Sequence, residues 1–408
     1  MARERSLVIV GGGQAAGRAA EAACAAGWDG PVRILAGEPR APYERPPLSK
    51  AVLTGAAGVD ETTLELGDAA GRVELHTATR VTAVDRATRT VTTADGESLG
   101  YDGLVLATGS RPRTLDVPGH HLPGVQTFRD ADDATALRDS LAAGERLVVV
   151  GGGYIGMEVA ASARKRGCAV TVLEAAPTVM ARQVVPELGA WFVELHRRHG
   201  AEIALDAKVA GFDGEQRVTG VRLDDGTVYP ADRVVVGVGI APSTELAEAA
   251  GLSVDDGIVV DEHGLTDDPR IAAAGDCTNH PNPVLGRRIR LESWQNAEHQ
   301  GRAAGASIAG SPTRHAQVPW FWSDQHCVNL QMVGLPETWD REVWRGDPED
   351  GACTVFLLYE GAVVGAQALD TGRDIGVARR MIERGVAPDP DALADPATPL
   401  KKVLKGAG

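Results

Sequence analysis

Two glycine turns, 140 residues apart, could each hold the pyrophosphate of a dinucleotide. In each copy an apolar run ends in glycines and a helix-forming segment follows; the copies read LVIVGGGQAAGRAAEAACA from Leu7 and LVVVGGGYIGMEVAASARK from Leu147. A backbone that approaches phosphates closely leaves no room for side chains, and the following helix offers free N–H groups and the positive end of its dipole. The fingerprint positions are Gly11, Gly13 and Ala16 in the first copy and Gly151, Gly153 and Gly156 in the second.

A glutamate ends the strand that follows each glycine turn. Glu38 and Glu174 can accept hydrogen bonds from ribose hydroxyls, which completes the pattern of a dinucleotide-binding unit. A single glycine turn also occurs for steric reasons alone, but two complete copies favour binding. The sequence therefore predicts two bound dinucleotides, and two dinucleotides in one chain imply redox chemistry between them.

The elements that position these residues are predicted as alternating strands and helices. The chain has 408 residues, enough for two to three domains with a large core. An apolar segment at 104–107 reads as a buried strand that runs into Thr108 and Gly109, a further glycine turn, and a strand-rich stretch at 201–240 follows the second unit. This order predicts an α/β protein.

Composition excludes several classes of function. The net charge of −15 would repel a polyanion, which argues against nucleic acid as a general partner. No stretch approaches the roughly 18 apolar residues of a membrane span, and the apolar run at 7–10 is too short for a signal peptide. We therefore expect a cytoplasmic protein.

The five cysteines are scattered along the chain and include no CxxC pair. Cys24 and Cys168 are predicted to fall on the helices of the glycine turns, where a small buried side chain is the expected role. We predict neither a disulfide nor a metal site. The cysteines are Cys24, Cys168, Cys277, Cys327 and Cys353.

Three segments outside the second unit resemble the FAD domain of flavoprotein reductases that bind two dinucleotides. They read GEPRAPYERPPLSK from Gly37 to Lys50, LVLATGSRPR from Leu104 and IAAAGDC, whose aspartate is Asp276. In this superfamily the first fingerprint takes the ADP half of FAD, and the aspartate of the GD motif contacts the ribityl chain and the flavin phosphate. The second unit would then serve the nicotinamide nucleotide. Glu174 would repel a 2′-phosphate there, so the resemblance implies NADH.

The last third resembles the NADH-dependent ferredoxin reductases of bacterial oxygenase systems. The residues that carry the likeness are LESWQNAEHQGRAA from Leu291, VPWFWSDQ from Val318 and LQMVGL from Leu330, and the similarity covers essentially the whole chain. His326 and Cys327 depart from the family, whose members often have tyrosine and an acidic residue there. The departure weakens the assignment of a particular acceptor.

The resemblance implies a glutathione-reductase-like architecture: two Rossmann-like dinucleotide-binding domains, for FAD and NADH, and a C-terminal α+β domain. The expected ranges are 1–112 and 241–318 for the FAD domain, 113–240 for the NADH domain and 319–408 for the C-terminal domain.

The same resemblance implies the site residues. FAD contacts would fall on Gly11, Gly13, Ala15, Ala16, Glu38, Arg45, Lys50, Val81, Thr108, Gly109, Arg129, Asp276, Trp294 and Trp320. NAD contacts would fall on Gly151, Gly153, Tyr154, Ile155, Gly156, Glu158, Glu174, Arg182 and Gly237.

Lys50 and Glu158 are the expected catalytic pair. Lysine near the flavin N5 edge would offer positive charge to incoming electron density, and the carboxylate would hold it in place. A solvent-facing Glu158 and a surface Arg129 are the plainer alternatives. Strand alternation would place Trp320 and Trp322 on one face, and whether either contacts the flavin or only packs in a core stays open.

The route of electrons out of the protein depends on the cysteines. Disulfide reductases of the superfamily need a cysteine pair after the first unit or in the nucleotide domain, and the segment 37–50 has no cysteine. Electrons would then leave singly, to a 2Fe–2S ferredoxin that serves a Rieske oxygenase or a cytochrome P450. The alternatives are a flavin-dependent NADH oxidase, a rubredoxin or nitrite-system reductase, and a DNA-binding protein like apoptosis-inducing factor, which the acidic balance disfavours.

Docking of an acidic ferredoxin would need local basic surface. Three clusters are candidates: Arg287, Arg288 and Arg290; Arg302 and Arg314; and Lys401, Lys402 and Lys405.

Overall fold

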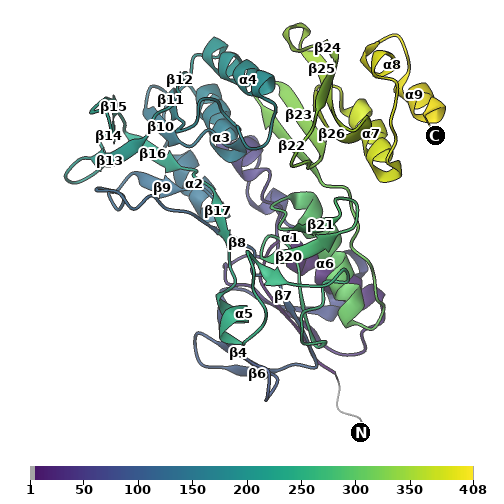
Figure 1. Cartoon of the computed structure of the whole chain (residues 1–408). Helices are drawn as coiled ribbons and strands as arrows, with labels where there is room; N and C mark the ends of the chain where they lie inside the picture. The colour runs from purple at the N-terminus through teal and green to yellow at the C-terminus, as the bar shows by residue number, and fades with distance from the viewer. Residues whose placement is uncertain (1–4, 408) are drawn as a thin grey trace.

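A computed structural model describes residues 5–407 and contains the predicted mixture of parallel sheets and helices (Figure 1). The first sheet has the strand order β19-β7-β1-β2-β3, and all its pairings are parallel. Its strands are β1 (Leu7–Val10), β2 (Val32–Leu35), β3 (Val73–His76), β7 (Gly103–Leu106) and β19 (Ile271–Ala273). Strands β1, β2, β7 and β19 are largely buried, as in sheets that helices and other layers cover, whereas the edge strand β3 is partly exposed.

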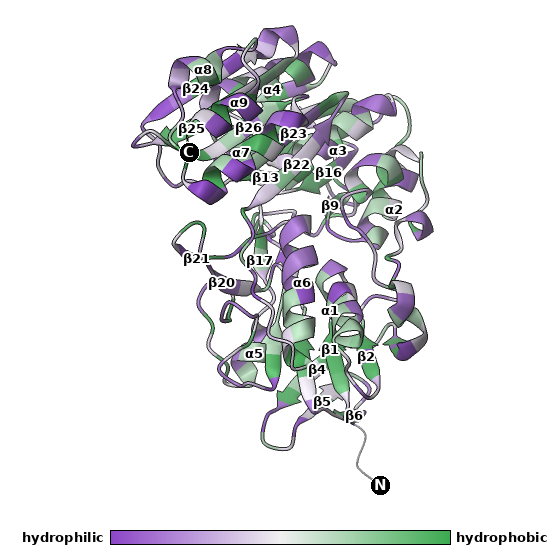
Figure 2. Ribbon diagram, turned by 90° about the vertical axis from the view of Figure 1, so that its right-hand side faces the viewer, coloured by the Kyte–Doolittle hydropathy of each residue, from purple (hydrophilic) through white to green (hydrophobic). Residues whose placement is uncertain are grey.

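Two helices lie side by side on this sheet, α1 (Gln14–Ala25) and α6 (Trp294–Ile308) (Figure 2). Glycines let them approach closely: a Cβ added to Gly301 would lie 2.6 Å from the Ala15 carbonyl oxygen, and one added to Gly305 would lie 2.1 Å from that of Ala19. Strands β4 (Val81–Asp85), β5 (Thr90–Thr93) and β6 (Ser98–Gly100) form an antiparallel sheet whose apolar side chains pack with those of β1 and β7.

The second parallel sheet has the order β12-β11-β10-β16-β9. Its strands are β9 (Val125–Thr127), β10 (Arg146–Val150), β11 (Ala169–Leu173), β12 (Glu202–Ala204) and β16 (Arg233–Val236). The accompanying elements are α2 (Ala131–Ser140), α3 (Tyr154–Lys165), α4 (Pro186–Arg198) and the small sheet β13 (Val209–Asp213), β14 (Gly220–Leu223) and β15 (Val228–Pro230).

The two parallel sheets are joined where the chain crosses between them twice. Strand β8 (Ser110–Pro112) leaves the first sheet and pairs antiparallel with β17 (Ile240–Pro242), on which the chain returns. The domain limits predicted at 112 and 240 fall at this pair, and the assignment of whole domains by residue range stays a prediction. The returning chain forms α5 (Glu245–Ala249), β18 (Ile258–Val259), β20 (Thr278–Asn282) and β21 (Arg287–Ile289).

The C-terminal part is an antiparallel sheet of order β22-β23-β26-β25-β24. Helix α7 (Gly372–Arg384) packs on the sheet and shares a core with it. The strands are β22 (Trp320–Gln325), β23 (Val328–Gly334), β24 (Arg341–Asp347), β25 (Ala352–Tyr359) and β26 (Ala362–Leu369), and helices α8 (Pro390–Ala394) and α9 (Leu400–Gly406) end the chain. The C-terminal part is therefore an α+β unit, and together with the two parallel sheets it confirms the predicted fold class.

Within residues 5–407 no helix is long and apolar enough to cross a membrane.

Candidate functional site: two phosphate cradles and a buried ion pair

The first glycine turn leaves room for a ligand at its tip. Gly11 has a φ of +133°, and a Cβ there would lie 2.1 Å from the Ala107 carbonyl oxygen, so only glycine fits. At Gly13, in contrast, a Cβ would meet nothing within 4 Å. Gly13 caps α1 without any side-chain hydrogen bond, and no acidic residue occupies the first turn of that helix. No side chain therefore caps the first turn of α1, and the space beside Gly13 is open, as a phosphate cradle requires.

The second glycine turn has the same construction, and the helix that follows it packs more closely on the turn. Gly151 has a φ of +106°, with the Gly237 carbonyl oxygen 2.4 Å from a built Cβ, and Gly153 faces open space at the uncapped start of α3. A Cβ on Gly156 would lie 2.1 Å from the Gly151 carbonyl oxygen. The matching position of the first turn is Ala16, fully buried, so α1 stands far enough from its strand to admit a methyl group.

The two acids have different partners. Glu38 accepts hydrogen bonds from the Tyr43 hydroxyl (2.7 Å) and from Arg45 Nη2 (2.6 Å). Glu174 accepts from backbone N–H groups, those of Gly152 (2.6 Å) and Ala176 (2.8 Å). Glu174 therefore contacts its own glycine turn, and both carboxylates are partly exposed.

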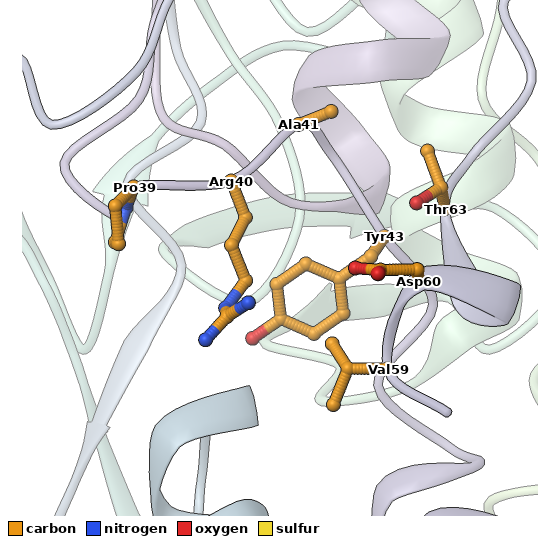
Figure 3. Close-up of a pocket in the computed structure, with 7 residues that line it drawn as sticks. All are labelled: Pro39, Arg40, Ala41, Tyr43, Val59, Asp60 and Thr63. Atoms are coloured by element: carbon orange, nitrogen blue, oxygen red, sulfur yellow. The ribbon is translucent and has the colours of Figure 1, made fainter. Parts of the chain in front are cut away.

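A pocket of about 240 Å³ opens beside the first acid (Figure 3). The Arg40 guanidinium extends toward the Tyr43 hydroxyl in this view, and the hydroxyl also binds Glu38. The pocket therefore lies near Glu38, the acid predicted to bind a ribose. Its lining residues are Pro39, Arg40, Ala41, Tyr43, Val59, Asp60 and Thr63.

Two residues predicted to contact FAD phosphates bind each other. Arg129 Nη2 lies 2.8 Å from Asp276 Oδ2, and Ser110 donates to the same carboxylate oxygen. Arg129 Nε is buried without a partner, which leaves a donor for a phosphate oxygen. Arg129 is therefore not a fully solvated surface cation, since 26% of its side chain is exposed, and its contact with FAD stays a prediction. Gly109, with a φ of +65°, forms the neighbouring turn after Thr108.

Lys50 and Glu158 form the predicted ion pair, with Lys50 Nζ 2.9 Å from Glu158 Oε1. Lys50 lies on a π-helical turn, η1 (Leu48–Val52), a geometry that often occurs at functional sites. Glu158 comes from α3 and is 2% exposed, so it does not face solvent. Two serine hydroxyls also donate to its carboxylate, Ser49 to Oε2 (2.5 Å) and Ser323 to Oε1 (2.7 Å).

Tryptophans lie beside this pair. Trp320 and Trp322 stack with their ring centroids 5.0 Å apart, so they share one face of β22 as the alternation predicts. Trp322 is edge-on to Trp294 at 6.0 Å, and Lys50 Nζ lies 6.0 Å from the Trp322 ring. Phe321, on the opposite face, packs 4.4 Å from the ring of Tyr154.

The other predicted residues lie on the same elements. Ala15 is buried against α6, and Val81 begins β4. Ile155 is 44% exposed at the start of α3, and Arg182 is exposed after β11. The structure does not test whether they contact a ligand.

Sequence reasoning missed the roles of Ser49, Ser323 and Tyr43. Ser49 and Tyr43 stand in the segment 37–50 and Ser323 in the PWFWSDQ string, so the motifs contained them. Nothing in the sequence indicated that Ser49 and Ser323 meet one carboxylate.

The cysteines offer no redox pair in the described structure. All five are free, and Cys277, next to Asp276, is fully buried. Burial raises the pKa of the Cys277 thiol, which disfavours the reactive thiolate. No group of histidine, cysteine and acidic side chains among residues 5–407 has the arrangement of a metal site.

The basic clusters differ in their partners. Arg302 is paired with Glu298 (2.8 Å) and Glu21 (3.1 Å), and Arg314 with Glu262. Arg287 and Arg290 also have acidic partners, and Arg288 donates to backbone and asparagine oxygens. Lys401, Lys402 and Lys405 are exposed on α9 with no carboxylate of residues 5–407 within ion-pair distance.

Comparisons with known proteins agree with this construction. Residues 5–301 match the pyridine nucleotide-disulphide oxidoreductase family, and residues 320–404 match a reductase C-terminal family. The chain is 45% identical to the ferredoxin–NAD(+) reductase component of the anthranilate 1,2-dioxygenase system of Burkholderia cepacia, over 98% of this chain and 99% of that protein. It is 40% identical to putidaredoxin reductase of Pseudomonas putida, over 98% and 97%.

A solved structure, the covalent complex of putidaredoxin reductase with putidaredoxin, matches with a TM-score of 0.95, at 40% identity and 99% coverage of both chains. The chain therefore belongs to the pyridine nucleotide-disulphide oxidoreductase family, as an oxidoreductase that binds FAD and uses a nicotinamide dinucleotide.

Proposed function

We propose that the chain is an NADH-dependent ferredoxin reductase of an oxygenase system, a Rieske oxygenase or a cytochrome P450. The observation that carries the proposal is the buried Lys50–Glu158 pair, which links the FAD-side segment 37–50 to α3 of the second dinucleotide unit. FAD, when bound, accepts a hydride from NADH and releases the two electrons one at a time.

The first cradle and its neighbours would hold FAD. The α1 N-terminus at Gly13 would bind its pyrophosphate, Glu38 its adenosine ribose, and Asp276 with Arg129 its phosphate and ribityl groups. Trp294 and the stacked Trp320 and Trp322 would lie at the isoalloxazine. Lys50 would present its ammonium to the edge that gains electron density, where fixed positive charge lowers the energy of the reduced form.

The second cradle would hold NADH. The N-terminus of α3 would bind the pyrophosphate, with Tyr154 and Ile155 in its first turn. Glu174 would accept from the adenosine ribose hydroxyls and repel a 2′-phosphate, so NADH would be preferred to NADPH. Arg182 and Gly237 are further proposed contacts. NADH is a cytoplasmic metabolite, so the proposal places the protein in the cytoplasm.

The electron acceptor is proposed to be a 2Fe–2S ferredoxin. Two relatives support this assignment: the Burkholderia cepacia protein is named a ferredoxin–NAD(+) reductase component, and putidaredoxin reductase was solved in complex with putidaredoxin. The described cysteines supply no dithiol that could take both electrons. Of the basic clusters, we favour the α9 lysines for docking because Arg302 is already paired with two carboxylates.

Cytochrome c reduction tests the proposal. The purified yellow protein, supplied with NADH, should reduce cytochrome c only when a 2Fe–2S ferredoxin is added, and heating should release FAD and not FMN. Rapid oxygen consumption without ferredoxin would instead identify an NADH oxidase.

A further inference from the structure

A line of buried side chains continues from Glu158 into the C-terminal sheet and back to α4. Ser323 donates to Glu158 and lies 3.2 Å from Gln325 Nε2. Gln325 Oε1 lies 3.0 Å from His196 Nε2, and His196 Nδ1 lies 3.4 Å from His326 Nε2. Ser323, Gln325 and His196 are all fully buried.

Donor and acceptor can be assigned for the hydrogen bonds that join Glu158, Ser323, Gln325 and His196. The Ser323 hydroxyl has a single proton, which goes to the carboxylate, so its oxygen must accept from the Gln325 amide NH₂. The Gln325 carbonyl oxygen then faces His196 and requires a proton on His196 Nε2. Burial lowers the pKa of His196 to about 4, which keeps that ring neutral with one N–H near neutral pH. A flipped Gln325 amide would break both contacts.

We propose that Ser323, Gln325 and His196 are positioning residues that hold the Glu158 carboxylate, and through it the Lys50 ammonium, in a single orientation. The C-terminal sheet is then part of the machinery for hydride acceptance. The inference rests on the proposed function in one respect, that Lys50 faces the flavin.

Residues on both faces of strand β22 influence the position of Lys50. Trp322 on one face lies 6.0 Å from Lys50 Nζ, and the Pro46 carbonyl oxygen accepts from the same ammonium at 3.3 Å. Ser323 on the other face fixes the Glu158 oxygen that Lys50 binds. A four-carbon stem gives lysine many rotamers, so contacts from several sides are needed to hold its charge at one point.

The line does not serve to deliver protons. An amide at Gln325 separates the serine from the histidine and does not readily pass a proton onward. The three donors to Glu158 are all occupied in holding the carboxylate. Ser323, Gln325 and His196 therefore act on the orientation of the carboxylate. The effect of replacing each residue should be smaller the farther that residue lies from Glu158.

The test compares three substitutions along the line: Ser323→Ala, Gln325→Met and His196→Gln. Hydride transfer, measured as flavin reduction by saturating NADH in stopped flow, should slow by about tenfold in Ser323→Ala, by the scale for a hydrogen bond to a charged group. It should slow less in Gln325→Met and least in His196→Gln. The affinity for NADH should change little, because none of the three lies at the dinucleotide turns.

Two further measurements separate positioning from loss of stability. Ser307→Ala removes another buried serine hydroxyl, at the far end of α6, and should leave flavin reduction unchanged. The reduction potential of bound FAD, titrated chemically without NADH, should become more negative in Ser323→Ala and not in Ser307→Ala. Ser323→Thr keeps the hydroxyl and should restore part of the rate.

The decisive step repeats Ser323→Ala in a Glu158→Gln background. If the serine acts through the carboxylate, it should have almost no further effect there. Flavin reduction in Ser323→Ala at the wild-type rate, or a full tenfold loss in both backgrounds, would overturn the proposal. If NADH fails to reduce even the wild-type flavin, the proposed function is wrong, and an unchanged potential in Ser323→Ala would still refute the positioning role.

Discussion

Replacing Glu174 with alanine should lower the specificity constant for NADH by about ten- to a hundredfold. A hydrogen bond from a hydroxyl to a carboxylate contributes about 1.5 to 3 kcal/mol, and each 1.4 kcal/mol is a factor of ten. The carboxylate that would make the proposed ribose contact is held in place, because its two oxygens accept from Gly152 N at 2.6 Å and Ala176 N at 2.8 Å. The loss should fall mainly on the Michaelis constant.

The same change should improve the use of NADPH. Two unit charges 4 Å apart repel each other by about 4 kcal/mol at an effective dielectric constant of 20. Glu174 is partly exposed, so solvent screening reduces this to on the order of 1 kcal/mol. The specificity constant for NADPH should therefore rise by about fivefold in Glu174→Ala, and more in Glu174→Arg, which adds a cation.

Glu174→Gln separates the ribose contact from support of the turn. Its amide oxygen can still accept one backbone N–H, but the charge is gone, so NADPH use should rise while NADH use falls less than in the alanine variant. Ferricyanide serves as the acceptor, because it needs no docking surface. Glu202→Ala, an exposed acid on the adjacent strand β12, controls for the loss of one negative charge. Unchanged NADH kinetics in Glu174→Ala would refute the ribose contact.

Three other outcomes follow from the structure. Single replacements Lys50→Met and Glu158→Gln should each slow flavin reduction, and the double change should cost less than the sum, because the two groups act as one unit; additive losses in stopped flow would contradict this. Reversal of Lys401 and Lys402 to glutamate should raise the Michaelis constant for ferredoxin and flatten its salt dependence while ferricyanide turnover stays constant; equal losses with both acceptors would mean that the lysines support folding. Burial lowers the pKa of His280 to about 4, so the unfolded state binds more protons than the folded state between pH 6.5 and 4. The free energy of unfolding should therefore decrease as the pH falls through that window, by about 2 kcal/mol at pH 5. His280→Phe should reduce this loss in denaturant titrations at pH 5 and pH 8, and an identical pH dependence would contradict it.

Sequence reasoning was most successful where one short segment contains the whole cause. The glycine turns are of this kind: the φ of +106° at Gly151 and the close approach of Gly156 to the Gly151 carbonyl oxygen follow from a local pattern. The Lys50–Glu158 pair was predicted only through the family resemblance, since the two residues are far apart in the chain. The three donors to Glu158 come from η1 and β22, and no spacing rule reports that such elements meet.

The basic clusters show a second limit of sequence analysis: the sequence does not reveal which carboxylates pair with a given arginine. Arg302 looks like free basic surface in sequence, yet Glu21 of α1 and Glu298 of its own helix both bind it. The close packing of α1 on α6 through Gly301 and Gly305 brings Glu21 into reach. A basic residue is a good candidate for docking an acidic partner only if no carboxylate of its own chain neutralises it. Among residues 5–407 the lysines of α9 meet this condition, whereas Arg302 does not.

The different partners of the two acids suit the ligands proposed for them, a resident FAD at Glu38 and an exchanging NADH at Glu174. Glu38 is held by Tyr43 and Arg45, and these side chains also bind the backbone at the start of α2, at Ala131 N and the Arg129 carbonyl oxygen. Loosening this site would disturb contacts between two parts of the fold, which favours slow release of a resident cofactor. Within residues 5–407, the donors to the Glu174 carboxylate are the backbone N–H groups of Gly152 and Ala176, so a nucleotide bound there could leave and another enter without breaking contacts elsewhere. A substrate that must exchange in every catalytic cycle requires the second arrangement, and FAD is retained better by the first.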